Sequence, residues 1–196
     1  LQKWSVSYRD DMLGNIMPFW LKHGLDLRNG GVYTCLDRDG SLIDTTKSVW
    51  FQGRFAFTCS YAYNHIEQNP EWLAAAKSTI DFIEQHCFDS DGRMFFEVTA
   101  SGEPLRKRRY VFSETFAAIA MAEYAIASGE REYAEKALKL FKDIQRFLNT
   151  PGVLEPKYWN TVQSKGHSIV MILINTASRI RAAIADPALD KQIDDS

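Results

Sequence analysis

Apolar residues recur every three or four positions through most of the chain, and this spacing predicts helices of two kinds. In the first kind, apolar and small residues occupy all sides of the helix, as they do in buried inner helices. Segments of this kind begin near Trp50, Glu114 and His167. In the second kind, apolar residues form one stripe, as they do in outer helices. Segments of this kind begin near Ser5, Pro70 and Glu130.

The breaks between these helices recur at a regular interval. Pro70, Glu130 and Pro187 each follow a strongly apolar helix, and they lie about 60 residues apart. Asn69 is a suitable N-cap for the helix that has Pro70 in its first turn. The repeat predicts an all-α fold, an α/α toroid of helical hairpins in which the starts of the inner helices face a common mouth. Three hairpins make about half of a six-hairpin ring, within a single domain of residues 1–196.

Other local signals predict shorter features. Pro18 lies inside the first helical pattern and is expected to kink its last turn. Extended backbone is expected at 32–36, and a short hairpin is expected at 94–98 and about 105–110. The stretch 150–166 has no helical or strand periodicity, and a loop of this length is usually functional.

Composition limits the classes of function. The 196 residues suffice for one domain, and 45% hydrophobic with 24% charged residues is typical of soluble globular proteins. A net charge of −2 gives no basis for binding nucleic acid or an anionic membrane, and no stretch approaches the ~20 apolar residues of a membrane span. Cys35, Cys59 and Cys87 have no metal-ligand spacing, which favours reduced thiols in a cytoplasmic protein. The start at Leu1, in mid-pattern and without methionine, favours a fragment or a trimmed chain.

The segment 47–54 carries the strongest candidate chemistry. Lys47, Trp50 and Arg54 are spaced by three and four residues, so on a helix they share one face. A cation, an indole and a guanidinium at a helix start suit a polar, ring-shaped ligand. The alternative is that Lys47 and Arg54 are surface charges and that Trp50 is buried, and the spacing alone does not decide between these interpretations.

Five short motifs follow one another along the chain. They are Phe19-Trp20, Gly30-Gly31-Val32-Tyr33, Leu36 to Gly40, Lys47-x-x-Trp50-x-Gln52-Gly53-Arg54 and Phe112-Ser113-Glu114-Thr115-Phe116. In this order and spacing they resemble the N-acylglucosamine 2-epimerase family, nearly from end to end. The resemblance implies an (α/α)6 barrel of which this chain is the N-terminal half. It also implies a reaction on a reducing sugar, either 2-epimerisation of N-acetylglucosamine, N-acetylmannosamine or cellobiose, or aldose–ketose isomerisation.

The resemblance implies roles for individual residues. Arg54 is similar to the family arginine that contacts the substrate oxygen at the reacting carbons, and His167 stands where some members carry an inner-helix histidine. The implied pocket residues are Tyr33, Lys47, Trp50, Gln52 and Glu114. The family's acid/base histidine pair belongs to the absent half of the barrel, so this chain alone is expected to have little activity. No metal or other cofactor is expected, and ATP or another nucleotide is an implied activator.

The reaction also places demands that can be compared with the residues directly. A sugar α-proton is weakly acidic, so its removal needs a base with a pKa of about 7 and a cation near the oxygen. Arg54 suits the cation because it stays charged. His167 can be a base, an acid for ring opening or a plain helix-start histidine, and Glu114 can be a first-turn acid favoured by the helix dipole. His65 is interpreted as structural and Glu123 as a surface residue.

Three functions stay open. The favoured one is a cytoplasmic sugar epimerase or isomerase with a small-molecule substrate. The second is a helical toroid that binds a sugar or a protein surface without chemistry, and exchange of the C2 proton with solvent separates these two. The third, a glycoside hydrolase, needs two carboxylates about 5–9 Å apart, and Glu114 has no obvious partner. The open apolar faces of a half ring predict a homodimer or a missing second half of the barrel.

Overall fold

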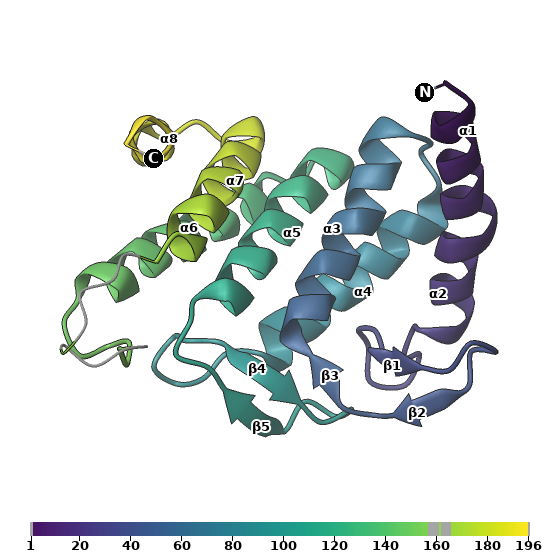
Figure 1. The fold of residues 1–196 in the computed structure, drawn as a ribbon, viewed down its shortest axis with the longest axis horizontal. Coiled ribbons are helices and arrows are strands. Elements are labelled where there is room, and N and C mark those ends of the chain that lie inside the picture. The colour runs from purple at the N-terminus through teal and green to yellow at the C-terminus, as the bar shows by residue number, and fades with distance from the viewer. Residues whose placement is uncertain (1, 157–160, 162–165, 196) are drawn as a thin grey trace.

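The chain folds into an arc of helical hairpins with short β-strands along one edge (Figure 1). The computed structural model describes residues 2–156, 161 and 166–195. The helices are α1 (Gln2–Asp11), the π-helix η1 (Met12–Ile16), α2 (Met17–His23), α3 (Val49–His65), α4 (Pro70–His86), α5 (Phe112–Ser128), α6 (Arg131–Asn149), α7 (Ser168–Ala183) and α8 (Pro187–Asp194). The strands are β1 (Cys35–Leu36), β2 (Leu42–Asp44), β3 (Lys47–Ser48), β4 (Phe95–Val98) and β5 (Pro104–Lys107). The prediction of helical hairpins arranged in an arc is confirmed.

The helices form two layers, as the two kinds of apolar pattern predict. Helices α3, α5 and α7 run side by side as the inner layer, with α5 packed between the other two (Figure 1). In the outer layer, α4 packs on α3 and α5, and α6 packs on α5. Every residue of α5 from Ser113 to Ala125 is buried, whereas α6 buries one stripe. The difference in burial between α5 and α6 therefore follows the distribution of apolar residues on these two helices. The inner helix α7 departs from the prediction, since it buries only Leu173, Thr176, Ala177 and Ile180.

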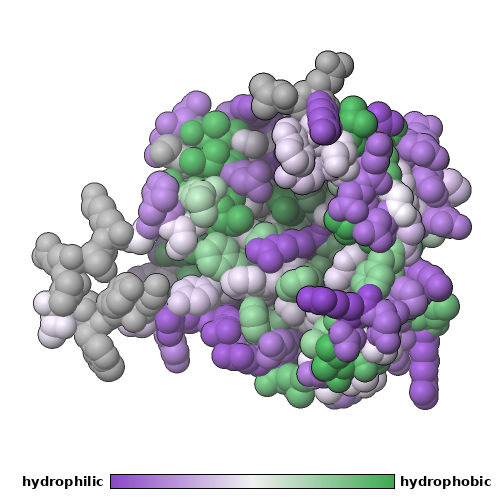
Figure 2. Space-filling view, turned by 45° about the vertical axis from the view of Figure 1, so that its right-hand side comes forward, coloured by the Kyte–Doolittle hydropathy of each residue, from purple (hydrophilic) through white to green (hydrophobic). Residues whose placement is uncertain are grey.

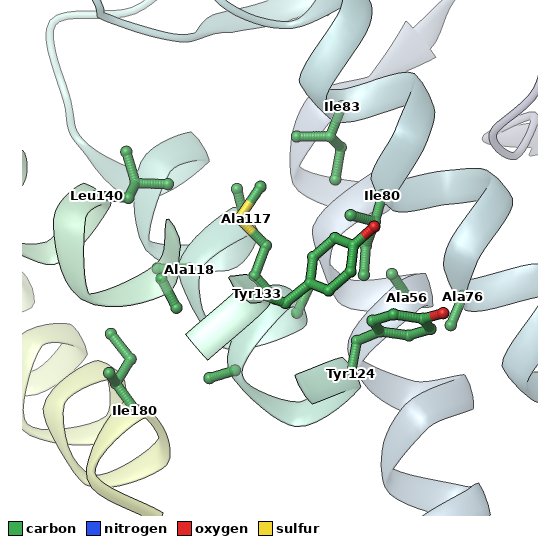
Figure 3. Close-up of a cluster of buried hydrophobic side chains, with 14 of the residues drawn as sticks. Ala56, Ala76, Ile80, Ile83, Ala117, Ala118, Tyr124, Tyr133, Leu140 and Ile180 are labelled. Atoms are coloured by element: carbon green, nitrogen blue, oxygen red, sulfur yellow. The ribbon is translucent and has the colours of Figure 1, made fainter. Parts of the chain in front are cut away.

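One cluster of buried side chains joins the two layers (Figure 3). Small residues line the contact between the inner helices, with Ala56 on α3 and Ala117 and Ala118 on α5 almost completely buried. Larger side chains come from the outer helices, such as Ile80 from α4 and Tyr133 from α6. Both layers combine small and large side chains, since the outer α4 also buries Ala76 and the inner α5 also buries Tyr124, and together they fill the core (Figure 3).

Gly53 marks a very close approach of α3 to α5. A Cβ atom at this position would lie 2.6 Å from the carbonyl carbon of Phe116 and 2.7 Å from its oxygen. Glycine is thus required here by packing and not by an unusual backbone conformation. Because the ring of Phe116 lies under Arg54, this contact also fixes part of the surface at the start of the inner helices.

The first two hairpins repeat one another in their loops. Each has an isolated antiparallel bridge just after its outer helix, and these bridges join Leu25 to Val32 and Phe88 to Met94. Each outer helix ends in a histidine whose ring lies against a turn glycine with positive φ. The pairs are His23 with Gly40 (φ +87°) and His86 with Gly102 (φ +93°). The internal repeat predicted from the spacing of the breaks therefore extends to loop geometry.

Strand β3 corrects one sequence prediction. Lys47 lies opposite Val98 of β4, and α3 begins only at Val49. Lys47 is therefore not on the helix that carries Trp50 and Arg54, and the predicted common face of the three side chains is wrong. The reason is a strand pairing between residues far apart in the sequence, which local spacing does not report.

The irregularity predicted from Pro18 is present, but at another place. Pro18 lies in the first turn of α2, and the helix widens into the π-helical segment Met12–Ile16 just before it. Proline has no N–H to donate and its ring crowds the carbonyl four residues earlier, so the helix adjusts upstream of it and not in its last turn. The preceding α1 has little cover, since Trp4 is 61% and Tyr8 71% exposed.

The remaining local predictions fall into two groups. The hairpin is confirmed as β4 and β5, and Asn69 caps α4 by accepting a hydrogen bond from the backbone N–H of Glu71. Of the predicted loop 150–166, residues 157–160 and 162–165 lie outside the described residues. Within the part of the chain that the structure describes, no helix is both long and apolar enough to cross a membrane.

Candidate functional site

A pocket of about 260 Å³ lies between the π-helix, α2 and α3. Its lining on α3 starts in the first turn of that helix, at Phe51. The end of the arc where α3 and α5 begin and where the strands lie is called the mouth here (Figure 1). The lining residues are Ile16, Met17, Trp20, Leu21, Val32, Tyr33, Phe51, Arg54, Phe55, Thr58 and Cys59. Figure 2 shows a face that is hollowed near its centre, where hydrophobic and hydrophilic residues lie side by side. Of the predicted site residues, the structure brings Tyr33 and Arg54 together here.

Arg54 presents an exposed guanidinium group next to aromatic rings. Its Cζ lies 4.1 Å from the ring centroid of Phe116 and 5.7 Å from that of Trp50. No carboxylate among the described residues forms an ion pair with it. A guanidinium on an aromatic face keeps its outer N–H donors free for a ligand oxygen.

Trp50 is the centre of an aromatic floor, a name used here for Trp50, Phe96, Phe112 and Phe116. Its ring centroid lies 5.1 Å from that of Phe96, 5.4 Å from Phe112 and 5.7 Å from Phe116. The first two contacts are edge-on, which is a favourable arrangement of aromatic rings. Trp50 is half-buried, so part of its side chain packs within the floor and part contacts solvent.

Tyr33 is held at the pocket by Gln52. The side chain of Gln52 accepts a hydrogen bond from Val32 N (2.9 Å) and donates one to Val32 O (2.7 Å). The preceding Gly31 has φ +72°, and a Cβ atom there would lie 2.6 Å from Gln52 Oε1. Burial, together with the nearby Asp26 carboxylate, raises the pKa of Tyr33 above its usual value of 10.0. The phenol therefore stays a neutral hydrogen-bond donor at physiological pH.

Lys47 lies beneath the mouth in a buried ion pair. Its Nζ donates to Asp26 Oδ2 (2.8 Å), Gly30 O (2.7 Å) and Ala100 O (2.9 Å), and its side chain is fully buried. Burial alone raises the pKa of Asp26, but hydrogen bonds from Lys47, Asn29 and the backbone outweigh it and hold that pKa far below its usual range. Lys47 therefore ties two mouth loops together.

Glu114 also lies inside the protein, in the first turn of α5. Its Oε1 accepts hydrogen bonds from Arg93 Nε (2.7 Å) and Met94 N (3.0 Å). Arg93 in turn donates through Nη2 to the backbone oxygens of Arg108 (3.2 Å) and Tyr110 (2.8 Å). A buried ion pair thus anchors the segment that leads from β5 into α5.

The structure corrects the prediction that all of the polar residues face the pocket. Lys47, Gln52 and Glu114 have no exposed surface, and each binds backbone groups of a mouth loop. The physical reason is that a buried polar group must be paired, and loops supply many unpaired backbone groups. These three residues support the site and do not line it.

His167 lies at the start of α7, one inner helix beyond α5. It is exposed, and its backbone oxygen accepts from Met171 N (3.1 Å). It is not among the residues that line the pocket with Arg54. Its catalytic role stays a prediction.

A second polar cluster was missed in the sequence. Glu123 was interpreted as a surface residue, but it is 2% exposed and accepts a hydrogen bond from Asn64 Nδ2 (2.8 Å). His65 Nε2 lies 3.4 Å from the same carboxylate oxygen. The signal that could have revealed it is the position of Glu123 on a helix that is otherwise apolar on all sides. Within residues 2–156, 161 and 166–195, no group of three His, Cys, Asp or Glu side chains could hold a metal ion.

With this geometry in view, comparison with known proteins identifies the family. Residues 31–176 match the family described as N-acylglucosamine 2-epimerase (GlcNAc 2-epimerase), and this match covers most of the chain. The chain belongs to the N-acylglucosamine 2-epimerase family. The resemblance stated from the motifs is therefore confirmed.

Individual relatives agree with this assignment. The chain is 30% identical over 177 residues to N-acylglucosamine 2-epimerase of Bos taurus, covering 87% of this chain and 42% of the relative. It is 31% identical over 141 residues to cellobiose 2-epimerase of Ruminococcus albus, covering 70% of this chain and 36% of the relative. The chain spans about half the length of the curated relatives it matches.

Solved structures show the same fold. The cellobiose 2-epimerase from Bacillus thermoamylovorans B4167 superposes with a TM-score of 0.86 at 20% identity, over 99% of this chain and 54% of that one. A sugar epimerase from a ruminal bacterium gives a TM-score of 0.82 at 23% identity, over 96% and 52%. The arc is therefore about half of an (α/α)6 toroid, as predicted.

Proposed function

We propose that the protein to which this chain belongs is a sugar 2-epimerase, acting on N-acetylglucosamine, N-acetylmannosamine or a related reducing sugar. The observation that carries the proposal is Arg54, a guanidinium without an acid partner among the described residues, placed between an apolar pocket and an aromatic floor. Membership of an epimerase family supports the reaction type. An aldose–ketose isomerase uses the same first step, but no feature of this site favours it.

In this proposal Arg54 binds the carbonyl oxygen of the open-chain sugar. Negative charge builds up on that oxygen when the C2 proton leaves, and a fixed guanidinium stabilises it more strongly than it stabilises the neutral carbonyl. Return of a proton to either face of the planar intermediate gives the two epimers. Trp50 supplies a flat face for the sugar, and the Tyr33 side chain forms part of the pocket wall.

The described pocket does not supply the base that removes the C2 proton of the sugar. Among the residues that line it, none is a histidine or a carboxylate. His167, at the start of the inner helix α7, is proposed to assist proton transfer or ring opening. We therefore expect the 196-residue chain alone to be weakly active, with the principal acid and base on a further part of the protein. No cofactor is required by this chemistry, and activation by a nucleotide stays a prediction.

The test is exchange of the C2 proton with solvent. The natural protein is incubated with N-acetylglucosamine, mannose or cellobiose in D2O, deuterium at C2 is followed by NMR, and the mass of the protein is measured in the same sample. Deuterium at C2 together with the C2 epimer as product supports an epimerase and names its sugar, whereas a ketose as product indicates an isomerase. A protein that binds a sugar without exchange is instead a binding module.

Replacement of Arg54 tests its role in the same assay. Arg54→Met should abolish exchange, and Arg54→Lys should restore only a small part of it, because lysine keeps the charge but lacks the planar fork of donors. The loss should be in kcat more than in KM if Arg54 acts on the developing oxyanion. Equal activity of both variants and the unchanged protein would remove Arg54 from the mechanism.

Two further expectations stay predictions. One is that the protein forms a homodimer or has a second half of the barrel, and the other is that it is cytoplasmic.

A further inference from the structure

Two more arginines lie on the aromatic surface of the mouth. Arg108 Cζ lies 4.4 Å from the ring centroid of Phe96, and Arg109 Cζ lies 4.9 Å from that of Tyr110. Arg109 Nη2 also donates to the hydroxyl of Tyr110 (2.7 Å). Trp50 contacts Phe96 directly, so Arg108 joins the surface that also carries Arg54.

These arginines are not neutralised, in contrast to their neighbours. Arg106 pairs with Glu97 (3.8 Å), and Lys107 pairs with two aspartates, Asp89 and Asp91, both at 2.7 Å. Among the described residues, no carboxylate forms an ion pair with Arg108 or Arg109. Of the four consecutive basic residues, Arg106 and Lys107 in β5 are therefore neutralised by carboxylates. Arg108 and Arg109, which follow β5, are the unneutralised half.

The backbone that carries the unneutralised half is fixed from inside. Arg93 is 4% exposed, and it donates hydrogen bonds to the carbonyl oxygens of Arg108 and Tyr110. Glu114 holds Arg93 in turn. A charged side chain on an anchored backbone loses less conformational entropy on binding than one on a free loop.

We propose that the mouth binds sugars that carry an anionic substituent, a phosphate or a carboxylate, and that Arg108 with Arg109 binds this substituent. Planar guanidinium groups match both anions with paired hydrogen bonds, and their contact with Phe96 and Tyr110 leaves the outer N–H donors free. A neutral sugar needs only one cation, for its carbonyl oxygen. The inference rests on the proposed function, because it names the substrate class of the same site.

Binding of matched sugars tests this inference. Calorimetric titrations compare glucose with glucose 6-phosphate and glucuronate, and inorganic phosphate serves as a probe without a sugar. We expect both anionic sugars to bind about tenfold more tightly than glucose, with a preference that weakens as salt is raised. Arg108→Gln should reduce the preference for glucose 6-phosphate about tenfold.

Arg106→Gln is the matched control. Arg106 lies over the same ring, with Cζ 5.5 Å from the centroid of Phe96, but it already has Glu97 as a partner. Its replacement should leave the preference for anionic sugars unchanged. An equal loss in both variants would show a general charge effect and overturn the inference, as would equal binding of glucose and glucose 6-phosphate to the unchanged protein.

Two further outcomes separate this inference from the proposed function. Inorganic phosphate that binds as tightly as glucose 6-phosphate would identify a site for a free anion and overturn the inference. A protein that exchanges C2 deuterium into neutral sugars without any preference for anionic ones would keep the proposed function and lose only the inference. A preference for anionic sugars without exchange into any sugar would support the anion site while rejecting the epimerase.

Discussion

Arg93 Nε lies 2.7 Å from Glu114 Oε1, and neither side chain has appreciable contact with solvent. The pair links the first turn of an inner helix to the backbone of the loop that precedes it, through the bonds from Arg93 to Arg108 O and Tyr110 O. Buried ion pairs gain little over apolar packing, but loss of one partner leaves a charge without compensation. Both residues should therefore be needed together.

Glu114→Gln should destabilise the fold by about 3 kcal/mol, because the Arg93 charge then stays buried without a carboxylate. Arg93→Met should destabilise the fold by a similar amount, because the buried Glu114 carboxylate then has no cation beside it. The double variant should be clearly more stable than the sum of the two single changes implies. Urea unfolding followed by circular dichroism measures all three free energies, and additive effects would contradict the coupling.

The Asp26–Lys47 pair should make the fold sensitive to acid. The folded-state pKa of Asp26 lies below the unfolded value of about 3.9, so its contribution to stability is complete above that pH. It is lost as the pH falls through the lower, folded-state pKa. The free energy of unfolding should therefore drop steeply below about pH 4, as measured by urea titrations at a series of pH values.

Replacement of Lys47 checks the cause of that acid sensitivity. Lys47→Met removes a principal hydrogen bond to Asp26 and should cost about 3 kcal/mol at neutral pH while it flattens the acid-dependent slope. The control is Lys107→Met, which removes an ion pair with the partly exposed Asp89 and Asp91. That change should cost less than about 1 kcal/mol. Equal costs for both lysines would mean that burial of the pair is unimportant.

Gly53→Ala should separate α3 from α5. The added methyl group would meet the backbone of Phe116 at 2.6–2.7 Å, so a cost of about 1–3 kcal/mol is expected although alanine is the better helix former. Gly14→Ala is the control, since no described atom lies within 4 Å of a Cβ atom at that helical position. Thermal unfolding should show a lower Tm for the first variant only.

The three free cysteines should differ in reactivity. Burial raises the pKa of Cys59 and of Cys87 to about 12, so both stay protonated and shielded at neutral pH. Cys35 is only half-buried. A chromogenic disulfide reagent should therefore titrate one thiol in the folded protein and all three in urea. Rapid reaction of Cys59 would mean that the pocket opens more widely than the structure shows.

The sequence predicted the features that depend on local pattern. Asn69 and Pro70 mark a helix start by rules that act within a few residues, and the apolar distribution separated inner from outer helices. Arg54 lies on a helix that was predicted correctly, and it lines the pocket. The same rules failed for Lys47, whose three-residue spacing from Trp50 suggested a helix while its backbone pairs with Val98.

The burial of polar residues was harder to predict from the sequence than the positions of the helices. Glu114 and Arg93 are separated by 21 residues, and the contact exists only because two hairpin elements meet in space. No local rule identifies such a partner, so the burial of Glu114, which the family resemblance placed in the pocket, was not predicted. Glu123 was misplaced for the same reason, since its partner Asn64 lies on another helix.

Gln52 and Glu114 perform the same task in successive hairpins. Each reaches back from the first turns of an inner helix to the loop before it, at Val32 and Met94 respectively. Each helix start is thus bonded to its own loop, and Lys47 joins the two loops by donating to Gly30 O and Ala100 O. A chimera that exchanges loop and helix start as one piece keeps its internal bonds, whereas a junction placed between them cuts those bonds. A graft of one rim also has to keep the bond from Lys47 to Ala100 O and the pairing of β3 with β4, because these contacts join the two rims of the mouth.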